Sequence, residues 1–279
     1  MTVTLYEGPL EDFETTARND RQFVVALARG LEILRVFMPG ETALSNSQIA
    51  ARTGLPKATV SRLTHTLTTL GYLAHDRHAR AYRLGDAVVG LGHGVLSGLD
   101  ICRRARPAMD ALAQETGMEI SLSRRDRLSM VVIERVALPG SRTYCVAVGS
   151  RIPVAATATG RAYLCAIAPA DRDYLLALLG ERAPSHLAAM QTGLERAQED
   201  FARDGFCISI GEWDSTVAAV AVPIYSPTRE IEAVMAGGIP SRFMTEMRLR
   251  QMAGPAFVHA AARLSETMGF AGPAARSTA

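Results

Sequence analysis

The sequence predicts an α+β protein of about two domains. Its 279 residues are too many for one ordinary core and too few for three. A helical apolar period dominates residues 23–70, whereas strand-like apolar runs alternate with helical stretches beyond residue 117. Hydrophobic residues make up 48% and charged residues 21%, which is a globular composition and excludes a disordered chain.

The N-terminal region begins with an acidic tail over residues 1–20, followed by a first helix. Residues 1–17 carry four acids and no base. From Phe23 onward, apolar residues recur at three- and four-residue spacing, as on one face of an amphipathic helix, and Pro39-Gly40 ends the pattern. The predicted stripe consists of Val24, Leu27, Leu31 and Leu34.

Two further helices have clear local signals. Ser45 and Gln48 fit a capping box, and Leu44 and Ile49 occupy the positions of a hydrophobic staple. This second helix ends at Gly54, which can adopt a positive φ. Pro56 suits the first turn of the third helix, which closes at Gly71. Its predicted buried face consists of Val60, Leu63, Leu67 and Leu70.

A small hairpin and a helical linker follow. Tyr72-Leu73 and residues 82–84 are predicted as short strands around a polar, basic tip over residues 76–80. Residues 86–116 are helical in pattern but rich in glycine, with Pro107 as a kink. We place the domains at 21–85 and 107–272, joined by a helical dimerisation linker over 86–106.

The second domain is predicted to be mixed α and β around an antiparallel-leaning sheet. Its expected strands cover residues 118–123, 129–136, 144–148, 217–225 and 231–238. Its expected helices cover residues 159–168, 171–179, 186–204 and 245–268.

Three helices followed by a basic hairpin describe a winged helix-turn-helix, which favours DNA binding. Residues 18–106 carry thirteen Lys and Arg against six Asp and Glu, although the whole chain has a net charge of only +2. The lone lysine, Lys57, falls in the first turn of the third helix. The predicted DNA contacts are Ser45, Lys57, Ala58, Thr59, Ser61, Arg62 and His65, with Arg77, His78 and Arg80 at the hairpin tip. The alternatives are a helical bundle with solvated arginines and a winged helix used for protein contacts.

A ligand pocket is expected around residues 155–161, where small residues precede an apolar helix. Thr159 is predicted to cap this helix, whose free N–H groups would attract a carboxylate, and Arg161 could add charge or point into solvent. A capped helix without a ligand is the alternative. The predicted contacts here are Thr157, Ala158, Thr159, Gly160 and Arg161.

Other candidates for the pocket come from the predicted strands. They are Ser209, Glu212, Trp213, Ala219, Met235 and Gly237, with Ser121, Ser123 and Tyr144 as weaker candidates. Trp213 could equally serve domain packing, Met235 could fill the core, and Glu212 could fix its loop.

The sequence argues against an enzyme, a metal site and a membrane protein. The four cysteines lie 20 or more residues apart without a CxxC pair, and the histidines lack metal-ligand spacing. The glycines of residues 90–94 have no GKS or GKT ending. No apolar run of about 18 residues and no secretory signal is found. Together with the widely spaced cysteines, this predicts a cytoplasmic protein, and we expect no cofactor.

Taken together, the motifs resemble the IclR-type bacterial transcriptional regulators. The resemblance rests on ALARGLEILRVF (26–37), LSNSQIAARTGLPKATVSRLTHTLTTLGYL (44–73), YRLGDAVVGLG (82–92), VGSRIPVAATATGRAYLCAIAP (148–169), GFCISIGEW (205–213) and residues 217–242. It implies a dimerising helical linker and a C-terminal GAF-like domain that binds a small effector. The implied assembly is a homodimer, or a tetramer formed by paired dimers, on double-stranded operator DNA.

The segment 151–166 is most similar to the subgroup that controls aromatic-acid catabolism through protocatechuate. The sequence departs from the family pattern at Ser209, Thr216 and Ala219. These departures leave the identity of the effector open. The sequence does not specify the operator or the sign of regulation.

Overall fold

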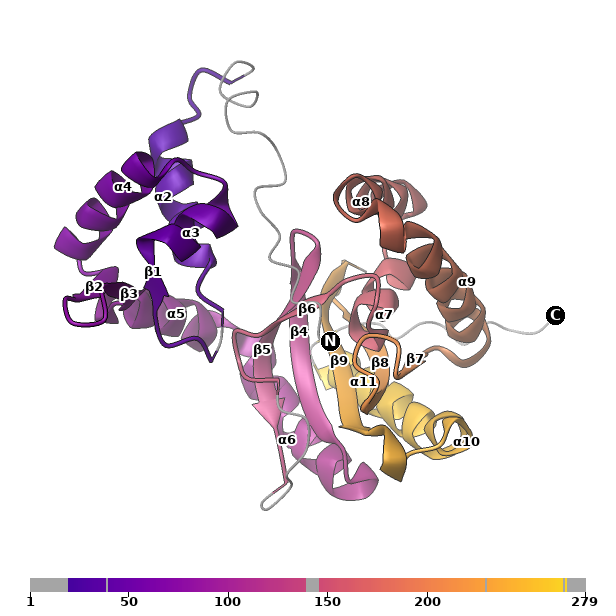
Figure 1. Cartoon of the computed structure of the whole chain (residues 1–279). Helices are drawn as coiled ribbons and strands as arrows, with labels where there is room; N and C mark the ends of the chain where they lie inside the picture. Colours follow the sequence, from indigo (N-terminus) through magenta and orange to yellow (C-terminus); the bar gives the residue numbers. More distant parts are fainter. Residues whose placement is uncertain (1–19, 39, 139–145, 229, 268, 270–279) are drawn as a thin grey trace. The chain divides into compact units, whose positions relative to one another are not determined.

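The computed structural model describes residues 20–38, 40–138, 146–228, 230–267 and 269 (Figure 1). The chain divides into two compact units that meet in sequence between Leu99 and Asp100. The expected acidic tail lies almost entirely outside the described residues.

The N-terminal unit is a winged helix-turn-helix. Its strands form a small antiparallel sheet in the order β1-β3-β2, in which Leu44 pairs with Tyr82 and Leu73 with Leu84. The elements, indigo to purple in Figure 1, are α2 (Val25–Arg35), β1 (Leu44–Ser45), α3 (Asn46–Thr53), α4 (Lys57–Thr69), β2 (Leu73–Asp76), β3 (Ala81–Leu84) and α5 (Asp86–Gly98).

The local signals of α3 are confirmed. Ser45 is its N-cap, and the reciprocal bonds of the capping box with Gln48 are both present. Gly54 ends the helix at a φ of 70°, a left-handed conformation that glycine adopts without steric cost. Pro56 takes the N-cap position of α4 rather than its first helical position.

The core of this unit differs from the predicted apolar stripes. It consists of Ile33, Val36, Phe37, Leu44, Ile49, Ala50, Val60 and Leu73. Val24, Leu27 and Leu31 are 53–62% exposed, and Leu70 is 61% exposed, so these buried-face predictions were wrong. The reason is that α2 carries apolar residues on two sides and turns only the Ile33 side toward α3 and α4.

The expected linker over residues 86–106 is shared between the two units. Helix α5 buries none of its residues, although Val89, Leu91 and Val95 are apolar. Helix α6 (Asp100–Thr116) runs through Pro107 and buries Ile101, among others, within the C-terminal unit.

The C-terminal unit is built on six antiparallel strands in the order β6-β5-β4-β9-β8-β7, which confirms the predicted antiparallel sheet and the α+β class. Its strands are β4 (Glu119–Asp126), β5 (Ser129–Val136), β6 (Arg151–Pro153), β7 (Cys207–Ile210), β8 (Val217–Tyr225) and β9 (Ile231–Pro240). Its further helices are α7 (Ala158–Ala166), α8 (Pro169–Arg182), α9 (Leu187–Asp204), α10 (Glu246–Arg248) and α11 (Gly254–Thr267), with short 3-10 turns at Pro184–His186 and Ser241–Phe243.

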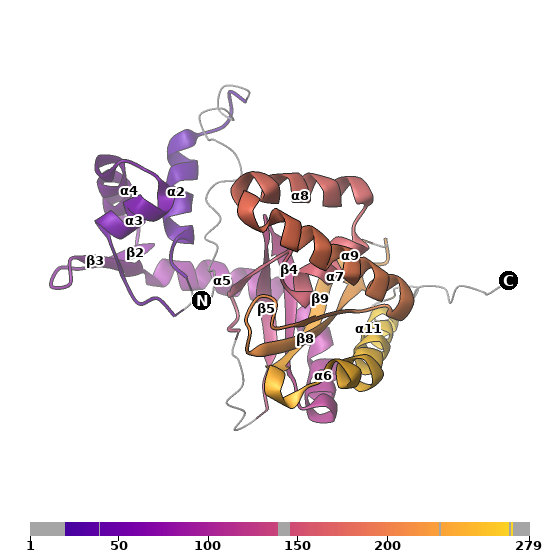
Figure 2. The ribbon, with the colours of Figure 1, turned by 45° about the vertical axis from the view of Figure 1, so that its right-hand side comes forward.

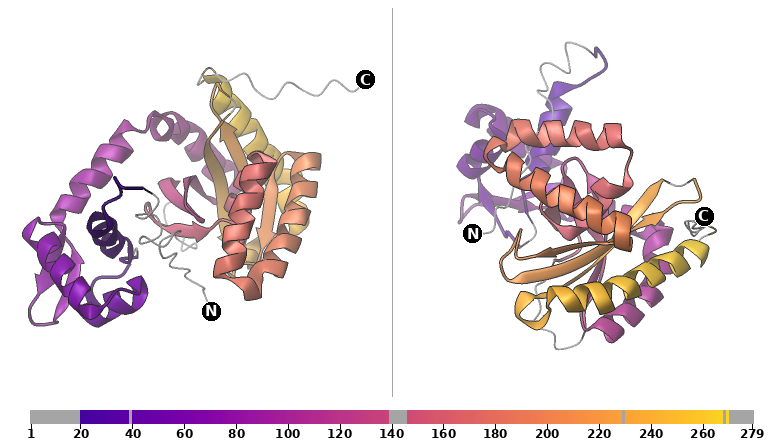
Figure 3. Two further views of the ribbon diagram at one scale, coloured as in Figure 1. Left: turned by 90° about the horizontal axis from the view of Figure 1, so that it is seen from above. Right: turned by 90° about the vertical axis from the view of Figure 1, so that its right-hand side faces the viewer.

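Helices cover both faces of this sheet (Figures 2 and 3). Helices α6 and α11 pack on one face, and α7 and α9 pack on the other, with α8 beside α9. Strand residues alternate between the two faces, and paired residues of neighbouring strands share a face. This alternation determines which side chains of the sheet face α7 and which face α6 and α11.

Two elements of the C-terminal unit differ from their sequence-based predictions. Of the strand predicted over 144–148, residues 144–145 lie outside the described part, and residues 146–148 are irregular. The helix predicted over 245–268 is interrupted by a π-helical turn at Leu249–Ala253, which carries Arg250.

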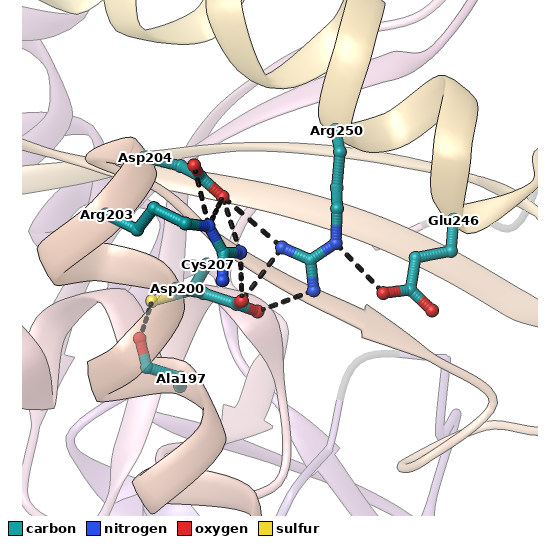
Figure 4. A network of polar contacts seen from close by, with 7 residues as sticks. All are labelled: Ala197, Asp200, Arg203, Asp204, Cys207, Glu246 and Arg250. Atoms are coloured by element: carbon teal, nitrogen blue, oxygen red, sulfur yellow. Dashed lines mark hydrogen bonds and ion pairs between the residues drawn. The ribbon is translucent and has the colours of Figure 1, made fainter.

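An ion-pair network holds this π-helical turn against α9 (Figure 4). The guanidinium of Arg250 donates to both carboxylate oxygens of Asp200, at 2.8 and 3.1 Å, and to Glu246 at 2.9 Å. Arg203 shares Asp200 and also pairs with Asp204, whose pKa is lowered chiefly by that bond. The network therefore fixes the C-terminal segment of the unit to α9.

Candidate nucleic-acid interface and ligand pocket

Helix α4 presents a polar, cationic face opposite its buried face. Lys57, Ala58, Ser61, Arg62 and His65 are exposed, and their spacing places them on one side of the helix. Val60 and Thr64 are fully buried on the other side. Thr59 is half-buried at the border of the two faces.

The cations of this face are available to a ligand. Among the described residues, neither Lys57 nor Arg62 has a carboxylate partner within ion-pair distance. Thr66 is exposed, but its hydroxyl donates to the Arg62 carbonyl oxygen. This face can therefore donate hydrogen bonds to phosphate oxygens and base edges.

The hairpin between β2 and β3 forms the wing. The N–H groups of His78 and Ala79 donate to the Asp76 carboxylate at 2.9 and 3.0 Å, which holds the turn and lowers the pKa of that carboxyl. Arg80 adopts a positive φ of 48°. Arg77, His78 and Arg80 are exposed at the tip, as a DNA-contacting wing requires.

Ser45 has a structural role in this unit. Its hydroxyl accepts the Gln48 N–H at 3.3 Å and donates to the Gln48 side-chain oxygen at 2.8 Å. The predicted DNA contact at Ser45 would therefore compete with the capping box.

A pocket lies in the C-terminal unit between the N-terminus of α7 and the sheet. About 460 Å³ of space within it, its open mouth included, is not filled by atoms. Six predicted residues line it, namely Thr157, Ala158, Thr159, Trp213, Ala219 and Gly237. Seven lining residues were not predicted as contacts or were weaker candidates, namely Glu119, Ser121, Val146, Ile152, Val217, Ala236 and Gly238.

The cap of α7 is Thr157, so the predicted cap at Thr159 was wrong. The Thr157 hydroxyl accepts the Gly160 N–H at 3.1 Å and donates to the Pro153 carbonyl oxygen at 2.9 Å. Thr159 lies inside the first turn. The N–H groups of Ala158 and Thr159 have no acceptor among the described residues, as expected for the first turn of a helix.

Arg161 neither lines the pocket nor points into solvent. Its side chain is buried, donates from Nε to the Ala155 carbonyl oxygen at 3.0 Å, and forms an ion pair of 2.6 Å with Glu212. It packs on Gly193 of α9, where a Cβ would lie 2.1 Å from the guanidinium. Arg161 thus fixes the loop that carries Glu212, which is the structural alternative considered for Glu212.

Gly160 is required by packing of the backbone. A Cβ at this position would lie 2.0 Å from the Val154 carbonyl oxygen. The small residue therefore permits close approach of the protein's own loop, whereas the sequence suggested the approach of a ligand.

Strand register explains which strand candidates reach the pocket. Met235 pairs with Leu122 and Val222 and faces α6 and α11, so it is a core residue. Gly237 has the same orientation, because a Cβ there would contact Phe257 of α11, and it lines the pocket only through its backbone. Ser209 pairs with Ala219 on the pocket face but is not among the lining residues.

Glu119 and Ser121 of β4 face the pocket beside Gly238 and Ala236, with which they pair. The Arg135 side chain donates two hydrogen bonds to the Glu119 carboxylate, from Nε at 2.6 Å and from Nη2 at 3.0 Å. Ser121 was a weaker candidate and does line the pocket. Ser123 is fully buried and does not line it, and Tyr144 lies outside the described residues. No local sequence motif identifies Glu119 or Gly238 as pocket residues. They lie together only because β4 pairs with β9.

Two thiols lie close together among the described residues of the C-terminal unit. Cys165 and Cys207 lie 3.9 Å apart, and the bond that Cys207 donates to Cys165, together with burial, raises the pKa of Cys207 well above its usual range. Within the described part of the chain, no cluster of His, Cys, Asp or Glu could hold a metal ion. No described helix has the length and apolar character to cross a bilayer.

The N-terminal unit has the winged helix-turn-helix fold of DNA-binding proteins, and a separate C-terminal unit contains the pocket. The model of the bacterial transcriptional regulator IclR C-terminal domain matches residues 93–266, and that of the IclR helix-turn-helix domain matches residues 26–77. The chain belongs to the IclR family of transcriptional regulators and not to an enzyme family.

Relatives extend over nearly the whole chain. The HTH-type transcriptional regulator TsaQ1/TsaQ2 of Comamonas testosteroni is 40% identical over 84% of both chains. The crystal structure of an IclR family regulator from Brucella abortus is 41% identical, covers 90% of this chain and 95% of its own, and has a TM-score of 0.82. An IclR homologue from Microbacterium hydrocarbonoxydans, solved with 4-hydroxybenzoate, has the same fold at 21% identity, with 88% and 99% coverage and a TM-score of 0.67.

Proposed function

We propose that this regulator binds operator DNA through α4 and the wing, and that a small carboxylate in the α7 pocket changes its affinity for DNA. The single observation that carries the effector assignment is the N-terminus of α7: Ala158 and Thr159 line the pocket, and no described residue accepts a bond from their N–H groups. A helix N-terminus carries a partial positive charge and favours an anion.

The walls of the pocket favour an acid with an apolar or aromatic body. Val146, Ile152 and Val217 are apolar, and Trp213 offers a flat ring. A homologue of the same fold binds 4-hydroxybenzoate. We therefore propose an aromatic acid of a catabolic pathway as the effector.

Gly238 provides the sharpest test of the pocket. It lines the pocket, and a Cβ at this position would meet no atom within 4 Å. Gly238→Val should therefore place apolar atoms in the pocket and abolish effector binding, while DNA binding without effector remains. Gly180→Ala on α8 is the matched control, because Gly180 does not line this pocket.

Calorimetry with 4-hydroxybenzoate, protocatechuate and pyruvate reads out this test. Binding of pyruvate alone would overturn the aromatic assignment and keep the carboxylate site. Unchanged binding in Gly238→Val would refute the pocket. Since the effector acts by preferring one state of the protein, it should change DNA affinity modestly, by ~1–3 kcal/mol.

The DNA interface is tested by charge removal on α4. Lys57→Ala or Arg62→Ala should weaken operator binding by ~1–3 kcal/mol if the contact is to a base, or flatten the salt dependence if it is to phosphate. Arg196→Ala is the control, because Arg196 is exposed on α9 of the other unit. Wild-type affinity and an unchanged salt slope in both α4 variants would refute the interface.

We further propose a homodimer, which could pair into a tetramer, on a near-palindromic operator. The apolar side chains of α5, such as Val89 and Val95 at 70% and 63% exposure, would otherwise remain in water. Val95→Glu should shift the assembly toward monomer in sedimentation at micromolar concentration, and a monomeric wild type would refute the proposal. Because a regulator that binds operator DNA must share a compartment with that DNA, we place the protein in the cytoplasm.

A further inference from the structure

The pocket holds polar groups on a second wall, away from α7. Glu119 on β4 is 5% exposed and lines the pocket. Its two carboxylate oxygens each accept one bond from Arg135, at 2.6 and 3.0 Å. A carboxylate oxygen can accept a second hydrogen bond, so this ion pair fixes Glu119 and leaves it able to accept a bond from a ligand.

Ser121, two residues along the same strand, has an unused hydroxyl. It is 6% exposed and lines the pocket, and its hydroxyl makes no hydrogen bond to another described residue. Thr159, in the first turn of α7, is 4% exposed and also lines the pocket, and its hydroxyl makes no hydrogen bond to another described residue. Both residues line the pocket, so their hydroxyls are accessible from it and can exchange water for a hydrogen bond to a ligand.

We infer that Glu119 and Ser121 form a specificity subsite for a hydroxyl group of the effector. The inference rests on the proposed carboxylate site at α7, which holds the other end of the same molecule. The effector hydroxyl donates its hydrogen to Glu119 and accepts a hydrogen from Ser121. The effector class is thereby narrowed to hydroxy acids.

The charge of Glu119 also excludes a class of ligand. A second carboxylate on the effector would face the Glu119 carboxylate. The single positive charge of Arg135 balances Glu119 and would leave the second carboxylate of the effector without a counter-charge. Like charges in a buried site repel strongly. Dicarboxylic acids should therefore bind poorly, and plain acids should bind without the gain from the subsite.

The test compares benzoate, 3-hydroxybenzoate, 4-hydroxybenzoate and terephthalate by calorimetry on the full-length protein. In the wild type, the better hydroxybenzoate should bind about tenfold or more tighter than benzoate, and terephthalate should bind weakest. Ser121→Ala should reduce the hydroxybenzoate preference several-fold without weakening benzoate. Ser265→Ala is the control, because this buried serine lies on α11 and bonds to the Ala261 carbonyl oxygen.

Glu119→Gln separates charge from shape. The amide keeps the size of the side chain but removes the negative charge beside Arg135, so terephthalate should bind at least tenfold tighter than it binds the wild type. Equal wild-type affinity for benzoate and both hydroxybenzoates, or no gain of terephthalate in Glu119→Gln, would overturn the subsite and leave the carboxylate site standing. Failure of all four acids to bind would overturn the aromatic-acid effector and the subsite together.

Discussion

Replacing Gly160 by alanine tests whether the start of α7 is fixed by contact of its backbone with the preceding loop. The added Cβ would lie 2.0 Å from the Val154 carbonyl oxygen and 2.4 Å from two other Val154 backbone atoms. Such contacts do not fall below 3.0 Å, so the helix and the loop must separate by about 1 Å. The separation also strains the bond between the Thr157 hydroxyl and the Gly160 N–H.

The expected destabilisation follows from these contacts. Overpacking costs ~1–3 kcal/mol or more, and a weakened cap adds ~1 kcal/mol, whereas alanine in a helix recovers ~1 kcal/mol relative to glycine. We expect Gly160→Ala to lower the free energy of unfolding of the C-terminal unit by roughly 1–3 kcal/mol.

Urea unfolding followed by the fluorescence of Trp213, the lone tryptophan of the chain, measures this change in the relevant unit. The control is Gly180→Ala, whose Cβ would meet only the flexible end of Leu187 at 3.0 Å. That variant should lie within ~1 kcal/mol of the wild type. A Gly160→Ala protein as stable as the wild type would refute the packing argument.

Three other sets of contacts can be tested by substitution. Ser45→Ala removes the N-cap of α3 and should cost ~1 kcal/mol, measured as faster hydrogen exchange of the α3 amides; unchanged exchange would contradict the cap. Asp200→Ala leaves Arg250 and Arg203 without their shared carboxylate. It should destabilise the C-terminal unit by about 2–4 kcal/mol in urea unfolding. Glu246→Ala, at the exposed end of the network, should lower the stability far less. The bond from Arg52 lowers the pKa of Glu41 below its ordinary 4.5, so the pair stabilises the fold fully above that value and loses its effect as the pH falls through the folded pKa. The deficit of Glu41→Gln in thermal unfolding should therefore be constant near neutral pH and vanish in acid; a deficit independent of pH would contradict it.

Elements with local signals could be predicted from the sequence. The bonds of the α3 cap join residues only three apart, so Ser45 and Gln48 reveal them without knowledge of the fold. The buried face of α2 could not be predicted in this way. Leu27 and Ile33 are both apolar and both fit a helical period, and only the packing of α3 and α4 decides that Ile33 is the core residue.

The pocket shows the same limit more strongly. Thr157 and Thr159 are equally good caps by residue type, and the backbone bends decide between them. Glu119 and Gly238 are paired across strands that lie far apart in the chain, and their side of the sheet depends on register. Met235 was misplaced for this reason, since a shift of one residue along β9 moves a side chain to the opposite face.

The single lysine of the chain, Lys57, allows α4 to be modified selectively by amine-directed reagents. Apart from the terminal amine, Lys57 carries the only primary amine of the 279 residues, and it is exposed on the face proposed to contact DNA. Acylating reagents that modify amines and spare guanidinium groups should therefore report on this one helix. Mass spectrometry of the modified protein becomes a single-residue footprint, in which operator DNA protects Lys57 and an effector that releases DNA restores its reactivity.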